Sequence, residues 1–195
     1  MFLRIFALII RYKTLVVGSI PRLISVFWWP SIQIVLWGFF STFLDSETSS
    51  PYSTISVLLT AVILWDVLFR GQLGLTITFF EEIWSRNLSH LFITPLRNFE
   101  LIIGLIITSF IRTVLGLIPA IFISTYYFEL KTFYLGFYFV IFFFNLIITG
   151  WSIGFIVSGL VLRYGQSFEE LAWAFIFLLL PFSCVYYPLS TLPEI

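Results

Sequence analysis

The chain has 195 residues, of which 60% are hydrophobic and only 10% are charged, and 25 of them are phenylalanine. Soluble domains carry about 25% charged residues, so this chain has too few polar side chains to cover a water-soluble globule. Ten basic residues balance ten acidic ones, which leaves no basic excess for binding nucleic acid. The composition predicts an integral membrane protein and excludes soluble, disordered and fibrous classes.

The N-terminal segment, residues 1–22, is apolar but too interrupted by charge for an ordinary membrane span. Its arginines Arg4, Arg11 and Arg22 are 7 and 18 positions apart, which places them on one face of a helix. A glycine and a proline punctuate the end of the segment. We predict a helix that lies in the membrane interface. The alternative is that these residues extend the first span at its cytoplasmic end.

The rest of the chain, residues 23–195, is predicted to form one transmembrane domain. A helix needs roughly 20 apolar residues to cross the hydrocarbon core of a bilayer. Five stretches fit this requirement and are predicted as spans: 23–44, 54–80, 99–128, 132–162 and 171–187. The expected fold class is therefore all-α integral membrane, with an N-terminal interfacial helix and five transmembrane helices.

The distribution of basic residues predicts the orientation, because loops rich in Lys and Arg stay in the cytoplasm. With the N-terminus in the cytoplasm, only Lys131 lies on an outside segment. The inside segments then hold seven basic residues, namely Arg4, Arg11, Lys13, Arg22, Arg86, Arg97 and Arg163. We expect a cytoplasmic N-terminus, in the plasma (inner) membrane.

Several short motifs follow one another along the whole chain. They are Trp29-Pro30, Trp37-Gly38, Leu68-Phe-Arg-Gly71, Phe80-Glu-Glu-Ile-Trp-Ser-Arg-Asn-Leu88, Ile93-Thr-Pro-Leu-Arg97, Tyr186-Tyr-Pro188 and Leu192-Pro193. In this order they resemble the permease subunits of ABC-2 type transporters, a family that includes drug and polysaccharide exporters. Members of that family normally have six spans, so the resemblance implies a chain without the final one.

The resemblance also implies partners. Two permease copies, as a homodimer or a related heterodimer, would form the pathway through the lipid bilayer, and a separate ABC ATPase subunit would hydrolyse ATP. The chain itself has no P-loop, because Lys13 follows Tyr12 and Lys131 follows Leu130 instead of glycine. One His and one Cys are too few for a four-ligand zinc site. We expect a transport subunit that is no enzyme and binds no metal or cofactor itself.

The longest polar stretch, residues 81–98, lies between the second and third predicted spans. Its apolar residues can share one side of a short helix, which Pro95 would end. The resemblance implies that this segment couples to the ATPase through Glu81, Glu82, Trp84, Arg86, Leu88, Pro95 and Arg97. The alternative is an interfacial helix that only joins two spans. In the other inside loop, 163–170, Ser167 is expected to start a helix, with a second ATPase contact as the alternative.

Three charged residues lie deep within predicted spans, namely Asp66, Arg70 and Arg112. Counting helical rise from the cytoplasmic ends puts all three at similar depth, so we predict a charged cluster there. The cluster either holds the second and third spans together or uses its surplus positive charge to pass an anionic group. Two other functions stay open: an ion-coupled secondary transporter or channel that uses Asp66, and a non-transporting membrane scaffold.

Small residues recur every four positions in two spans, as Gly150, Gly154 and Ser158 and as Gly116, Ala120 and Ser124. This spacing lets two helices approach closely. We expect the two stripes to pack within one subunit; the alternative is a seam between two subunits.

Overall fold

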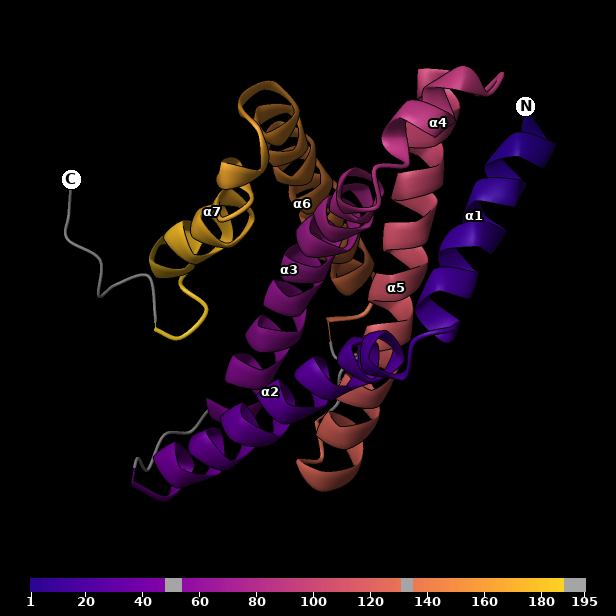
Figure 1. The fold of residues 1–195 in the computed structure, drawn as a ribbon. Coiled ribbons are helices and arrows are strands. Elements are labelled where there is room, and N and C mark those ends of the chain that lie inside the picture. Colours follow the sequence, from indigo (N-terminus) through magenta and orange to yellow (C-terminus); the bar gives the residue numbers. More distant parts are fainter. Residues whose placement is uncertain (48–53, 131–134, 188–195) are drawn as a thin grey trace.

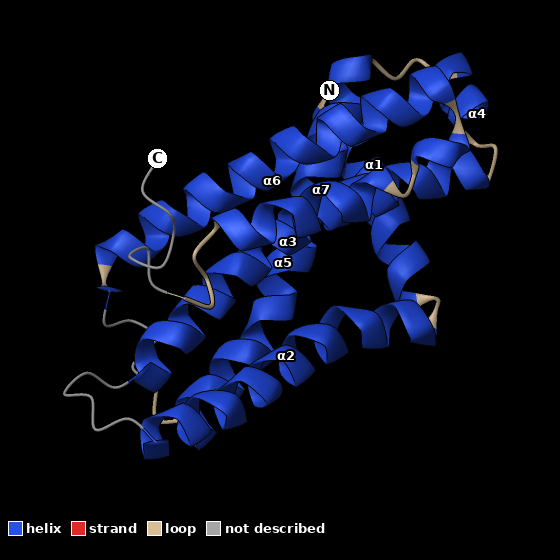
Figure 2. Cartoon of the chain, turned by 90° about the vertical axis from the view of Figure 1, so that its left-hand side faces the viewer, coloured by secondary structure: helices blue, strands red, loops and turns tan. Residues whose placement is uncertain are grey.

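The computed structural model describes residues 1–47, 54–130 and 135–187, and this part of the chain is helical without a strand (Figure 2). The element order is α1 (Phe2–Val17), α2 (Ile20–Glu47), α3 (Thr54–Trp84), α4 (Leu88–Ile93), α5 (Asn98–Tyr127), α6 (Phe137–Tyr164), the 3-10 turn η2 (Gln166–Phe168), α7 (Leu171–Leu179) and the 3-10 turn η3 (Leu180–Phe182).

Four helices are long and apolar enough to cross a membrane, which confirms the α-helical membrane class. The candidate spans are Ile20–Leu44, Ser56–Trp84, Asn98–Tyr127 and Phe137–Tyr164. They correspond to the first four predicted spans. The second continues past its predicted end at Phe80, so that Glu81 and Glu82 belong to the last turn of α3.

The fifth predicted span, 171–187, is not a spanning helix in the part of the chain that the structure describes. Its α-helix, α7, has nine residues and is followed only by the short 3-10 turn η3. Nine residues rise about 14 Å, roughly half the hydrocarbon thickness. Pro181, inside η3, lacks the backbone N–H that a continuing helix needs. The described residues therefore contain four candidate spans, and the predicted count of five is not confirmed.

The N-terminal segment forms a helix of its own instead of extending the first span. α1 ends at Val17, where the backbone N–H of Gly18 bonds to the carbonyl of Thr14 at 2.8 Å, and α2 starts two residues later. Figure 1 shows α1 outside the bundle, beside α5. One face of α1 is buried through Ile5, Leu8 and Tyr12, and the large side chains Phe2, Leu3 and Phe6 are exposed. An apolar exposed face of this kind is what a helix in contact with lipid presents.

α3 is the central helix and packs against α2, α5 and α6 (Figure 1). Its buried side chains, including Leu59, Val62, Ile63, Val67 and Leu75, have no solvent exposure. The small residues of α6 make the closest approach. A Cβ atom added at Gly150 would lie 2.6 Å from the carbonyl oxygen of Leu68, and one added at Gly154 would lie 3.1 Å from the hydroxyl of Thr76. This stripe therefore packs against α3 of the same chain.

Candidate functional site

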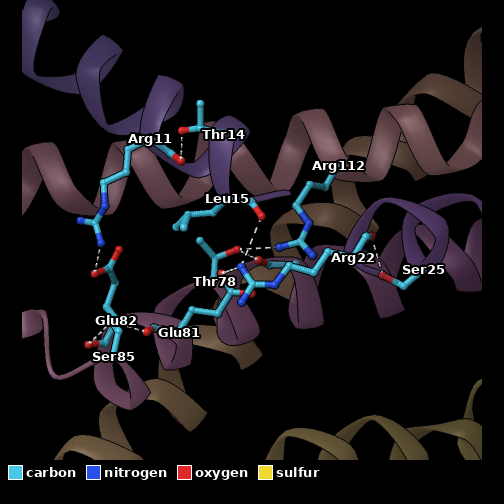
Figure 3. A network of polar contacts seen from close by, with 11 residues as sticks. Arg11, Thr14, Leu15, Arg22, Ser25, Thr78, Glu81, Glu82, Ser85 and Arg112 are labelled. Atoms are coloured by element: carbon cyan, nitrogen blue, oxygen red, sulfur yellow. Dashed lines mark hydrogen bonds and ion pairs between the residues drawn. The ribbon is translucent and has the colours of Figure 1, made fainter. Parts of the chain in front are cut away.

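The charged residues gather where α3 ends and α5 begins. Glu82 is only 1% exposed, and a buried carboxylate needs polar partners. One of its oxygens accepts hydrogen bonds from the guanidinium of Arg11 at 2.8 Å and from the side-chain amide of Asn87 at 2.7 Å. Arg11 comes from α1, so this contact fixes the N-terminal helix to the end of α3 (Figure 3).

Two more ion pairs link the N-terminal region to the same end of the bundle. Arg22, in the first turn of α2, lies 3.5 Å from Glu81. Arg4 lies 3.4 Å from Glu100, which also accepts a hydrogen bond of 3.0 Å from the backbone N–H of Arg97 at the start of α5. We call the three pairs Arg4–Glu100, Arg11–Glu82 and Arg22–Glu81 the N-terminal clamp. The three arginines do not share the single helical face predicted for them, because Arg4 and Arg11 belong to α1 and Arg22 belongs to α2. All three nevertheless pair with carboxylates on α3 and α5.

Tyr12 packs beneath the N-terminal clamp and is almost fully buried. Burial raises the pKa of its phenol well above the ordinary value, and the neighbouring negative charge of Glu82 raises that pKa further. The phenol therefore stays protonated and neutral beside the carboxylate. It adds apolar contact between α1 and α3 without adding a second negative charge.

The short helix α4 presents an apolar surface at this end of the molecule. Leu91 is buried against the core, whereas Phe92 is 57% exposed and Ile93 is 83% exposed. The helix ends before Pro95, and Thr94 has the extended conformation that a following proline favours. We define the α4 tip as the exposed residues Trp84, Phe92 and Ile93.

The structure divides the residues predicted to couple to an ATPase into two groups. Glu81 and Glu82 are occupied by Arg22 and Arg11 of the N-terminal clamp and are shielded from a partner. Leu88 is partly buried against the core. The remaining residues are exposed, namely Trp84, Arg86, Pro95 and Arg97.

The second loop predicted to lie inside, 163–170, contacts the first. The indole N–H of Trp84 donates a hydrogen bond of 2.7 Å to the carboxylate of Glu169. The expected helix start at Ser167 is wrong, because Ser167 lies in the turn η2 and α7 begins at Leu171 with Glu170 as its N-cap. The two predicted cytoplasmic loops are therefore joined at one end of the bundle.

The predicted intramembrane cluster is only partly assembled. Asp66 is buried and accepts a hydrogen bond of 2.5 Å from Arg70, four residues further along α3. A second nitrogen of Arg70 donates to the backbone carbonyl of Val26 at 3.1 Å, which ties this pair to α2. The pair is local to α3, as the spacing of four residues favours.

Arg112 is not brought to Asp66. Among the described residues its guanidinium donates one hydrogen bond, of 2.9 Å, to the hydroxyl of Thr78. The register of α3 and α5 explains the difference, because Gly116 of α5 packs against Arg70 and Arg112 lies one turn closer to the charged end. Counting from Phe80 misplaced the two helices because α3 continues to Trp84.

Three polar residues that sequence reasoning missed hold the spans together. Gln72 is fully buried and donates a hydrogen bond of 2.6 Å to the carbonyl of Ala172 in α7. Ser109 donates to the carbonyl of Gly71 at 2.9 Å and accepts from the indole of Trp151 at 3.1 Å. A side-chain amide within an otherwise apolar span was the available signal for Gln72.

Compared with protein-family models, curated proteins and solved structures, the chain matches none of them. The residues and their geometry are thus the basis for assigning a function.

Proposed function

We propose that this chain is the membrane permease subunit of an ATP-driven exporter of the ABC-2 type. With a second copy or a related chain it would form the pathway through the bilayer, and a separate ATPase would supply the energy. The support is the ordered series of motifs, the four candidate spans and the α4 tip between two of them. The observation that carries the proposal is that α4 is exposed on one side, packs through Leu91 on the other, and stands between two spans to which short turns connect it.

The contacts of α4 and its flanking turns with α3 and α5 make it suited to transmit movement to these two helices. Leu91 packs into the core that includes side chains of α3 and α5. On the α3 side, Asn87 bonds to Glu82, and on the α5 side, Glu100 bonds to the backbone of Arg97. A force on the exposed side chains would therefore move α3 and α5 together instead of deforming a loose connection. This favours a coupling segment over a simple connector.

An amphipathic helical segment of this kind can dock into an apolar groove of a soluble partner. Phe92 and Ile93 supply the apolar contacts, and the exposed Arg86 and Arg97 surround them with positive charge. We propose that the partner is the ATPase and that this end of the bundle is cytoplasmic, as the distribution of Lys and Arg favours. Cofactor binding is then confined to ATP in the partner.

Ion-coupled transport through Asp66 has less support. A coupling carboxylate must exchange its cation, whereas Asp66 is buried and bonded to Arg70, which is itself bonded to α2.

The other alternative, a non-transporting membrane scaffold, also has less support. A scaffold would not need an exposed apolar tip between two spans.

Single cysteines at two exposed serines test both the orientation and the docking. Ser89 lies on α4, and Ser46 lies at the opposite end of the bundle, in the last turn of α2. Each is changed to cysteine in a chain that carries Cys184→Ser. We expect Ser89→Cys to crosslink to a protein with a P-loop in intact cells and to resist a membrane-impermeant maleimide added outside. Ser46→Cys is the matched control, which we expect to react with the maleimide and to give no such crosslink.

The opposite labelling pattern would contradict the orientation. If Ser89→Cys crosslinks only to lipid and to no protein, docking of the α4 tip on an ATPase is contradicted. The proposed orientation would be unaffected by that result.

A further inference from the structure

Arg112 has an unusual position for a charged residue in a membrane span. Its guanidinium carries five N–H donors, yet the described residues provide one hydrogen-bond acceptor, the hydroxyl of Thr78, and no carboxylate within ion-pair distance. Thr78 in turn donates to the carbonyl of Gly74 at 2.6 Å, so its oxygen is oriented to accept from Arg112. Thr78 thus holds the guanidinium in place without neutralising it.

Arg112 adds a positive charge to surroundings whose other charges are balanced. Glu81, Arg22 and Arg70 are the charged groups within electrostatic range of its guanidinium. Arg70 is neutralised by Asp66, and Glu81 is paired with Arg22. The pairs Arg70–Asp66 and Arg22–Glu81 are each neutral, so the charge of Arg112 is left in excess. Figure 3 shows Arg22 and Arg112 approaching the last turns of α3 from two different helices.

Within 1–47, 54–130 and 135–187, the nearby carboxylates already have partners. Asp66 is held by Arg70, Glu82 by Arg11 and Asn87, and Glu100 by Arg4. The excess charge therefore calls for an anion from outside the chain, because an unneutralised arginine in a span is costly.

The position of the Arg112 guanidinium indicates which kind of anion lies within its reach. The side chain of Arg112 runs toward the end of α3, to Thr78, which lies six residues from the last residue of that helix, Trp84. Six residues correspond to about 9 Å of helix, so the group reaches toward the headgroup region, as long basic side chains in spans do. Arg22 is 41% exposed and Arg112 is partly buried, so an anion would reach the site from the Arg22 side. Guanidinium groups bind phosphate with two parallel hydrogen bonds.

We propose that Arg22 and Arg112 bind the phosphate group of an anionic phospholipid from the adjacent leaflet. Arg112 contacts the phosphate from α5, Arg22 contacts it from α2, and Thr78 positions Arg112. The bound lipid would bridge α2 and α5 beside the N-terminal clamp. The site needs no ATPase, so it is tested on this chain alone and stands or falls independently of the proposed transport function.

Lipid retention tests the site. The full chain is placed in nanodiscs of phosphatidylcholine with a small, fixed fraction of phosphatidic acid, transferred to detergent, and its retained lipid is measured by native mass spectrometry. We expect the wild-type chain to keep one phosphatidic acid. Arg112→Gln and Arg22→Gln should each lower that retention about tenfold, as the loss of one charge-assisted contact implies.

Two matched variants separate the site from general charge attraction. Arg112→Lys keeps the charge and should keep most of the retention, and Arg163→Gln removes an exposed arginine at the end of α6 and should change nothing. Unchanged retention in both Arg112→Gln and Arg22→Gln, or an equal loss in Arg163→Gln, would overturn the proposal. A second arm offers inorganic phosphate alone, and binding of that ion without retained lipid would overturn the assignment to a lipid.

Discussion

Replacing Gly150 with leucine is expected to abolish the folded protein. A Cβ atom at this position would lie 2.6 Å from the carbonyl oxygen of Leu68 and 2.9 Å from the backbone nitrogen of Gln72. Both are backbone atoms of the central helix α3, so neither can turn aside as a side chain can. We expect a loss of about 3 kcal/mol or more in the free energy of unfolding, at the upper end for overpacking.

The measurement is the fraction of chain that elutes as a single species on size exclusion in mild detergent. Gly159→Leu is the matched control on the same helix, because nothing lies within 4 Å of a Cβ atom there. We expect Gly159→Leu to behave as wild type. Equal behaviour of the two variants would contradict the close packing of α6 on α3.

Breaking the Arg11–Glu82 pair of the N-terminal clamp is expected to cause the second large loss of stability. Arg11→Met would leave the buried carboxylate of Glu82 with Asn87 alone. Removing one partner of a buried ion pair costs about 3–5 kcal/mol, and we expect the lower end because the Arg11 side chain is 34% exposed. α1 should then detach from α3 before the bundle itself unfolds.

Limited proteolysis detects this detachment as faster cleavage after Lys13, and thermal unfolding in detergent detects the loss of stability. Lys13→Met is the matched control for stability, because Lys13 is exposed on the same helix. The exchanged pair Arg11→Glu with Glu82→Arg should recover part of the stability. No change in Arg11→Met would mean that the Arg11–Glu82 pair contributes nothing to the position of α1.

The parts of the fold that depend on hydropathy could be predicted from the sequence, and those that depend on register could not. The first four spans follow from their apolar length. The fifth prediction counted apolar residues through Pro181, where the helix stops. Pro30 and Pro119 lie inside α2 and α5, so a proline alone does not decide the matter.

The sequence indicated that the N-terminal arginines matter but did not give their helices or their partners. The predicted face shared by Arg4, Arg11 and Arg22 is wrong for Arg22, because α1 ends at Val17 and Arg22 belongs to α2. Their carboxylates lie 59 to 96 positions away in the sequence, on helices whose relative heights the spacing does not give. Arg112 was assigned to Asp66 for the same reason, although the structure brings it to Thr78.

The central claim is that the α4 tip connects this chain to a separate ATPase. Ile93 is its most exposed residue, and its side chain makes no contact on which the bundle depends. The direct measurement is the Mg-ATP hydrolysis that co-purifies with the tagged chain from its native membranes, compared for wild type, Ile93→Asp and the control Ser46→Asp at the opposite end. The account predicts equal hydrolysis for wild type and Ser46→Asp, and its loss for Ile93→Asp with folding intact. Absence of hydrolysis from the purified wild type, or equal hydrolysis with Ile93→Asp, would contradict it.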